Sequence, residues 1–319
     1  MPPLPMPGNL PLRAALLLEG HCRGPDRARS PPYARPVTTE LDLDLGGERT
    51  LHVYDCGPTG AGDDLVVFWH HGTPGLGVPP EPLVPAAAAL GIRWVSFDRP
   101  GYGGSTRLPE RNVVSMAADT GAVAHALGVD RFAVFGASGG GPHALACAAA
   151  MPDRVLGAVS IAGLAPFSAE NLAWFDGMAP AGEAELRAAT AGPAVLAEHL
   201  TTAAFDPEIF TPADHMALAG IWSWLGDVAG QAVQGGIDGM VDDDLAYVGP
   251  WGFDPAQLSV PVLFVHGEKD RIVPAAHSMW LADQVAEAEL RLRPQAGHIS
   301  VLAEGVAAMK WLTRIAADG

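Results

Sequence analysis

One serine lies among four glycines in the stretch FGASGGGPH, and this arrangement could carry nucleophilic chemistry. Gly136 and Gly140 stand two positions before and two positions after Ser138, which fits the pattern G-x-S-x-G. An apolar run precedes the motif and an alanine-rich run follows it, which predicts a strand, a sharp turn and a helix. Such a turn strains the serine backbone and exposes the hydroxyl. This context favours a nucleophile at Ser138 over an inert glycine-rich connection.

A serine hydroxyl needs a base to take its proton, and the usual base is a histidine oriented by a carboxylate. Among 11 histidines, His298 lies in a loop between a short predicted strand, 288–294, and a predicted helix. Asp270 directly follows a strongly apolar run, and the interval to His298 has room for one helix and one strand. We expect these two side chains to be neighbours, with Glu268 as the alternative acid.

Acyl transfer also needs two hydrogen-bond donors aimed at the oxygen that becomes negatively charged. The predicted turn after the serine offers the N–H of Gly139 as the first donor. The loop HGTPG, residues 71–75, follows an earlier apolar run, and its Thr73 is the natural second donor. Taken in isolation, the same loop also fits a simple glycine and proline turn.

These residues follow elements that alternate between strand and helix. The pattern at 41–57 predicts a β-hairpin that turns at Gly46 and Gly47. Strands alternating with helices imply an α/β fold with a mostly parallel central sheet flanked by helices, in which reactive residues gather at the carboxyl ends of the strands. Continuous apolar runs, typical of strands buried on both faces, occur at 63–72, 92–98, 131–136, 154–163 and 260–270.

The alternation is interrupted between residues 165 and 250, where several helical patterns follow one another without a strand. We expect this stretch to be an inserted helical lid over the strand ends. Most of its aromatic and methionine side chains should form the core of the lid, and some of them should face the serine and line an apolar pocket. The acidic run Asp242 to Asp244 is expected to be a solvated face of the lid rather than a metal site. The predicted domains are a loosely ordered leader at 1–38, a core at 39–164 and 251–319, and the lid at 165–250.

The segments HGTPG, FDRPGYGGS, GASGGGP, HGEKD and GHIS, in this order, resemble the α/β-hydrolase fold superfamily over about residues 40–315. The resemblance implies that Ser138 is the nucleophile, Asp270 the acid and His298 the base. It implies further that Thr73 and Gly139 form the oxyanion hole.

The other motif segments limit what the resemblance says about substrate. FDRPGYGGS is similar to a turn that family members carry after their fourth strand, so Asp98 and Arg99 are interpreted as structural. The serine at position 138 argues against the epoxide hydrolases and haloalkane dehalogenases, which use an aspartate nucleophile. GASGGGP also differs from the GGSWG of proline iminopeptidases, and HGTPG differs from the HGGG of one lipase and esterase branch. The resemblance therefore implies the catalytic machinery and leaves the substrate open.

The composition excludes several kinds of partner. The net charge is −17, with 36 acidic and 19 basic residues, which argues against nucleic acid and anionic membranes as partners. Three cysteines without a C-x-x-C pair argue against a disulfide framework and a cysteine zinc site, and they suit a reducing, cytoplasmic location. We expect a small-molecule substrate and neither a metal nor an organic cofactor.

Together these patterns predict a serine hydrolase, in the simplest case a carboxylesterase, that cleaves an ester of a small, fairly apolar substrate through an acyl-enzyme. The same residues could serve a peptidase or amidase, an acyltransferase or a cofactor-free perhydrolase. A ligand-binding receptor with slow turnover is the alternative outside the enzymes. The sequence does not indicate the oligomeric state.

Overall fold

The computed structural model describes residues 37–57 and 64–318. Most of the predicted leader, residues 1–36, lies outside the described residues. Its last two positions, Val37 and Thr38, already belong to the first strand, so the folded core begins two residues earlier than predicted.

The centre of the molecule is a sheet of eight strands in the order β1-β2-β4-β3-β5-β6-β7-β8. β1 and β2 form the predicted hairpin, β2 pairs antiparallel with β4, and all further neighbours are parallel. The prediction of a mostly parallel sheet is therefore confirmed. The strands are β1 (Val37–Gly46), β2 (Arg49–Gly57), β3 (Leu65–His70), β4 (Ile92–Phe97), β5 (Phe132–Ala137), β6 (Val155–Ile161), β7 (Val262–Gly267) and β8 (Ala288–Arg293).

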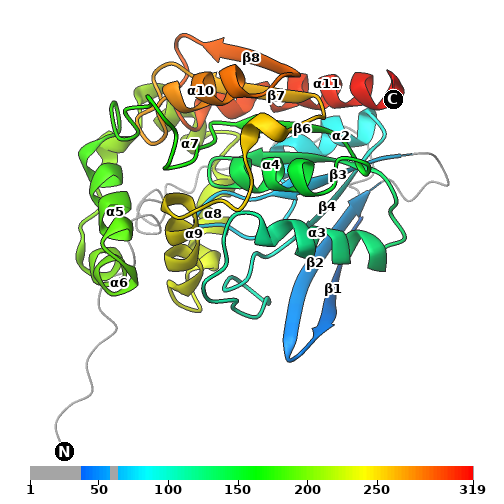
Figure 1. The fold of residues 1–319 in the computed structure, drawn as a ribbon, viewed down its shortest axis with the longest axis horizontal. Coiled ribbons are helices and arrows are strands. Elements are labelled where there is room, and N and C mark those ends of the chain that lie inside the picture. Colours follow the sequence, from blue (N-terminus) through cyan, green and yellow to red (C-terminus); the bar gives the residue numbers. More distant parts are fainter. Residues whose placement is uncertain (1–36, 58–63, 319) are drawn as a thin grey trace, which may run out of the picture.

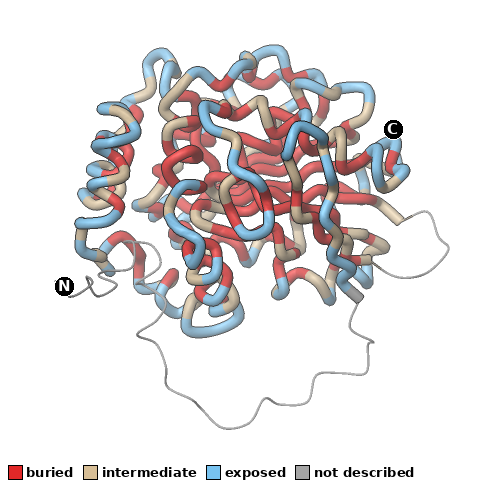
Figure 2. The backbone as a smooth tube through the Cα atoms, turned by 90° about the horizontal axis from the view of Figure 1, so that it is seen from below, coloured by how far each residue is buried: buried red, intermediate tan, exposed pale blue. Residues whose placement is uncertain are grey.

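Helices cover both faces of this sheet, which explains why its inner strands are mostly apolar. Along β3, Phe68 packs into one hydrophobic core, while Val67 and Trp69 pack into the other. Figure 2 shows the buried strands at the centre and exposed positions on the outer turns. The first core contains residues of α3 (Ser115–Ala126), α4 (Gly140–Ala150) and α10 (Ala276–Gln284), and the second contains residues of α2 (Val84–Ala89) and α11 (Gly305–Asp318).

Between β6 and β7 the chain forms helices and no strand, as predicted for residues 165–250. Figure 1 shows α5, α6, α8 and α9 gathered on one side of the sheet. Three of the five α-helices begin with a proline, whose fixed backbone angle suits the first turn of a helix. The helices are α5 (Pro180–Thr190), α6 (Pro193–Thr202), α7 (Pro212–Ala219), α8 (Trp224–Ala232) and α9 (Asp238–Val248).

None of the helices in the described part of the chain combines the length and the apolar character that crossing a bilayer requires.

Candidate active site

Ser138 lies in a strained turn between β5 and α4. Its φ is 53°, a left-handed value that few residues other than glycine adopt. The Ser138 N–H donates to the carbonyl of Ile161 on β6 at 2.8 Å. A Cβ atom at Gly136 would lie 2.1 Å from the carbonyl oxygen of Gly140, and one at Gly140 would lie 1.9 Å from that of His70. The turn can therefore form only with glycine at both positions, as the motif predicts.

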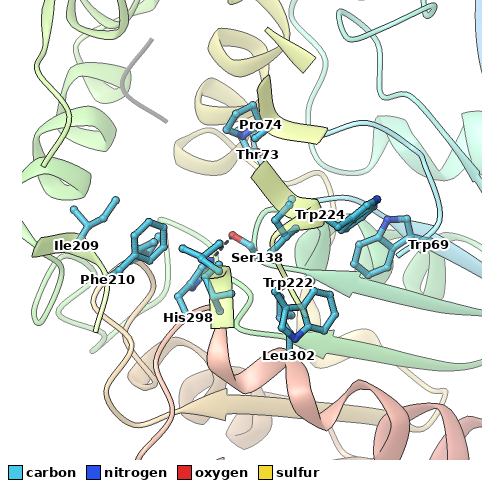
Figure 3. A pocket seen from close by; sticks show the side chains of 17 residues that line it. Trp69, Thr73, Pro74, Ser138, Ile209, Phe210, Trp222, Trp224, His298 and Leu302 are labelled. Atoms are coloured by element: carbon cyan, nitrogen blue, oxygen red, sulfur yellow. Dashed lines mark hydrogen bonds between the residues drawn. The ribbon is translucent and has the colours of Figure 1, made fainter. Parts of the chain in front are cut away.

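The structure brings Ser138, His298 and Asp270 together in a line of hydrogen bonds (Figure 3 shows the first two). The Oγ of Ser138 lies 2.9 Å from Nε2 of His298, and Nδ1 of His298 lies 2.7 Å from Oδ2 of Asp270. Because a carboxylate can only accept, Nδ1 carries the proton and Nε2 is left to accept from the serine. Glu268, the alternative acid, is exposed and is not a partner of His298.

The Asp270 carboxylate is buried and held in place on both oxygens. Oδ1 accepts from the N–H groups of Ile272 and Val273 at 2.8 and 2.9 Å. Oδ2 faces His298 and also lies 3.3 Å from Nε2 of His266. Burial alone would raise the pKa of Asp270, but His298 and His266 hold that pKa well below its usual range. Asp270 is therefore ionised when it orients the imidazole.

The loop that carries His298 is held by Asp214 of α7, in the segment between β6 and β7, a role that the sequence patterns did not indicate. Oδ1 of Asp214 accepts from the N–H of Ile299 at 2.9 Å and from the N–H and O–H of Ser300, both at 2.8 Å. Oδ2 accepts from the N–H and O–H of Thr211 at 3.0 and 2.8 Å. A Cβ atom at Gly297 would lie 2.1 Å from Oδ2 of Asp214, so the loop approaches this carboxylate as closely as glycine allows.

We expect Asp214→Ala to lower the free energy of unfolding at pH 7 by about 3 kcal/mol, because it leaves the buried N–H and O–H donors of this loop without an acceptor. Burial raises the pKa of Asp214, but hydrogen bonds from Ser300 and Thr211 lower it below the ordinary value overall. The part of this contribution that depends on ionisation is thus fully present above the unfolded pKa, about 3.9, and is lost as pH falls through the lower folded pKa. Urea denaturation should show the gap between wild type and variant shrinking below about pH 4.

The matched control is Asp254→Ala, because Asp254 is an exposed cap that accepts only from the N–H of Ala256. This variant should cost about 1 kcal/mol. Equal losses in the two variants would contradict a special anchoring role for Asp214.

Thr73 and Gly139, the candidate oxyanion donors, lie in segments that touch one another. Thr73 follows β3, and Gly139 immediately precedes α4. A Cβ atom at Gly139 would lie 2.7 Å from Oγ1 of Thr73. Both residues and Ser138 line one small gap in the structure. His71 steadies the loop, since its Nδ1–H donates to the carbonyl of Gly72 at 2.8 Å and its Nε2 accepts from a backbone N–H at 3.1 Å.

The acidic run Asp242 to Asp244 is not a solvated face, so this expectation was wrong. All three residues are buried, and Asp243 is fully so. Asp243 faces the guanidinium groups of Arg99 and Arg111, at 2.6 and 2.7 Å. The physical reason is that α9 packs its acidic side against two arginines that lie far away in the sequence. Arg99 therefore connects its turn to α9 through this ion pair. Asp98 holds the turn itself, because its carboxylate accepts from the N–H groups of Gly77 and Gly104.

A cavity of about 120 Å³ opens beside Ser138 and His298. Figure 3 shows indole and phenyl rings surrounding the serine hydroxyl. Trp69 lies on β3 and Leu302 follows β8, and the segment between β6 and β7 supplies much of the remaining wall. Its wall residues include Ile209, Phe210, Leu218, Trp222, Trp224 and Leu225. Within residues 37–57 and 64–318, no group of three or more His, Cys, Asp or Glu side chains is arranged to hold a metal ion.

Solved structures with the same architecture come from several bacteria. A hydrolase from Pseudomonas aeruginosa PA01 is 17% identical, with a TM-score of 0.64 over 87% of this chain and 98% of that chain. An enol-lactonase from Burkholderia xenovorans LB400 is 20% identical, with a TM-score of 0.64 over 87% and 100%. A thermophilic esterase from Thermogutta terrifontis is 22% identical, with a TM-score of 0.62 over 87% and 99%. At these identities the likeness shows the fold and nothing finer.

The sequence itself also matches a known family. Comparison with curated proteins gives no match. The family model described as "alpha/beta hydrolase fold" matches residues 66–304, which is most of the chain and includes all five candidate site residues. This protein belongs to the α/β-hydrolase fold family.

Proposed function

We propose that the protein is a serine hydrolase that cleaves carboxylic esters of small, apolar substrates through an acyl-enzyme, beneath a lid formed by residues 165–250. The observation that carries this proposal is the hydrogen-bonded line from Ser138 through His298 to Asp270, which begins at the wall of an apolar cavity. An apolar cavity beside a nucleophile suits a neutral substrate with a small hydrocarbon group.

In the first half of the reaction, Oγ of Ser138 attacks the acyl carbon while its proton passes to Nε2 of His298. The ester carbonyl oxygen becomes an oxyanion, and the N–H groups of Thr73 and Gly139 donate to it. Loss of one such donor costs about 10²- to 10³-fold in kcat in serine hydrolases. His298 then gives its proton to the departing alcohol as the C–O bond breaks.

In the second half, a water molecule attacks the acyl-enzyme and passes one proton to His298. The tetrahedral intermediate collapses, the carboxylic acid leaves, and Ser138 regains its proton from His298. Asp270 stays ionised throughout, because its pKa lies well below the working range and it stabilises the imidazolium that forms twice per turnover. The residues themselves therefore supply the nucleophile of the first half, and the base and the oxyanion donors of both halves, while water is the second nucleophile.

The size of the cavity limits the hydrocarbon group. A cavity of about 150 Å³ in another protein holds one benzene molecule, and the cavity here has about 120 Å³. We expect kcat/KM to rise from two to about four carbons and to fall at least tenfold by eight carbons, because each methylene gains about 0.8 kcal/mol only while it fits. Two series test this: p-nitrophenyl esters of increasing acyl length and acetates of increasing alcohol length. One of the two should show the limit.

Trp224→Ala should move this limit to longer chains, because the half-buried indole lines the cavity. The matched control is Trp280→Ala, since Trp280 is also half-buried but lies on α10 outside the cavity wall. An unchanged chain-length profile in Trp224→Ala would show that the substrate does not occupy this cavity.

A fluorophosphonate probe separates an enzyme from a ligand-binding receptor. The proposal requires covalent labelling of the folded protein at Ser138, because the probe reacts with an activated serine. Folded protein that stays unlabelled and hydrolyses none of the esters would overturn the proposed function. Hydrolysis of an amino-acid anilide faster than of any ester would move the activity to the peptidases.

A further inference from the structure

The lid helix α9 directs two side chains toward the segments that carry the candidate oxyanion donors. Asp243 and Tyr247 stand four residues apart, so they lie on the same face of the helix. Both are buried. Asp243 is hydrogen-bonded to Thr73, and Tyr247 is hydrogen-bonded to Thr73 and to Gly139. The lid is thereby joined to both halves of the proposed oxyanion hole.

Asp243 holds the Thr73 side chain by a direct hydrogen bond. Its Oδ2 accepts from the Thr73 hydroxyl at 2.6 Å, from Arg99 at 2.6 Å and from the hydroxyl of Tyr102 at 2.9 Å. Its Oδ1 accepts from Arg111 at 2.7 Å and from Nε of Arg99 at 3.1 Å. Both carboxylate oxygens are therefore saturated, and the Thr73 hydroxyl is held in a fixed direction.

Tyr247 connects the two donor segments. Its hydroxyl lies 2.8 Å from Oγ1 of Thr73 and 3.0 Å from the carbonyl oxygen of Gly139. Arg99 also holds the Thr73 loop, because it donates to the Gly72 carbonyl at 3.0 Å and to the Thr73 hydroxyl at 3.1 Å. The peptide unit before Thr73, the Thr73 side chain and the peptide unit after Gly139 are thus tied to one cluster.

A buried ion cluster of this kind is weak evidence for a role in stability, because apolar residues of the same shape often stabilise a protein equally well. Electrostatic stabilisation of an oxyanion, in contrast, depends on donors that are already aimed before the reaction begins. We propose that Asp243 and Tyr247 are positioning residues that aim the Thr73 and Gly139 amides, so that the oxyanion hole is completed from the lid. This inference rests on the proposed function.

Three variants test the proposal. Tyr247→Phe removes one hydroxyl and keeps the ring. Asp243→Asn keeps the shape and removes the charge. Asp242→Asn is the matched control, because Asp242 is the adjacent buried carboxylate on the same helix but pairs with the surface residue Arg107. Activity is expressed per active site, titrated with the fluorophosphonate, so that partial unfolding does not lower the measured kcat.

We expect kcat per titrated site to fall roughly tenfold in Tyr247→Phe, as for one lost hydrogen bond, and about 10²-fold in Asp243→Asn, as for donors that are slightly misplaced. KM should stay within about threefold of the wild-type value, because the loss is confined to the transition state. The inhibition constant of a trifluoromethyl ketone, which adds to Ser138 and places an oxyanion in the hole, should rise by the same factors. Asp242→Asn should keep the wild-type kcat.

The proposal is overturned if Tyr247→Phe and Asp243→Asn both keep kcat per site and the inhibition constant within twofold of wild type. Tyr247→Phe decides alone if Asp243→Asn does not fold. Failure of the proposed function looks different, because the wild-type protein itself would then neither hydrolyse esters nor react with the fluorophosphonate.

Discussion

Replacing Ser138 by alanine is expected to lower kcat for ester hydrolysis by about 10⁶-fold. The variant loses the atom that forms the acyl-enzyme, while the His298 and Asp270 side chains stay in place. The measurement is initial-rate hydrolysis of a p-nitrophenyl ester, together with fluorophosphonate labelling, which should disappear. The fold should persist, because the Ser138 backbone N–H and carbonyl keep their hydrogen bonds to Ile161 and Gly141, although the hydrogen bond from the hydroxyl to His298 is lost.

Ser259→Ala, at an exposed serine outside the site, is the control and should behave as wild type. The double variant Ser138→Ala with His298→Ala should be no slower than either single variant, since nucleophile and base act as one unit. Loss of the nucleophile should leave far less than about 1% of the wild-type activity. Residual activity above that level in Ser138→Ala would show that another residue is the nucleophile.

Replacing Asp270 by asparagine is expected to lower kcat by about 10⁴-fold. The Oδ1 atom accepts from two backbone N–H groups, so the asparagine carbonyl takes that side and its NH₂ group faces Nδ1 of His298. Nδ1 must then accept, the ring proton moves to Nε2, and the imidazole can no longer take the proton of Ser138. The kcat and the rate of fluorophosphonate labelling should fall together.

Glu268→Gln is the matched control for the acid, because Glu268 lies two residues earlier and is exposed. Its kcat should stay within twofold of wild type. The reverse outcome, a large loss in Glu268→Gln and none in Asp270→Asn, would show that Glu268 and not Asp270 is the acid.

The sequence predicts the fold well because its local patterns agree with one another. Short apolar runs that alternate with helical patterns favour inner strands between two helical layers, and the eight-stranded sheet has this form. Element ends are predicted less well. The predicted leader, for example, extends to residue 38, but Val37 and Thr38 already pair with Gly57 and Cys56 of β2.

The position of the candidate site was also predictable, because Ser138, Asp270 and His298 each follow a strand whose carboxyl end lies at the same edge. The roles of two carboxylates between β6 and β7, Asp214 and Asp243, were not predictable. Asp214 stands in the pattern Thr-Pro-Ala-Asp, which signals a helix start through the capping box, but nothing local shows that it also holds the segment after His298. The hydrogen-bond partners of Asp243 lie between 132 and 170 positions away in the sequence.

The Asp214 contacts have a consequence for protein engineering. One way to alter specificity is to exchange the helical segment between β6 and β7, because it supplies much of the cavity wall. In this protein such a graft would remove the acceptor for the Ile299 and Ser300 amides together with the old pocket wall. A working chimaera must carry an aspartate at the position of Asp214 and meet a recipient scaffold with glycine at 297, where any larger residue would collide with it.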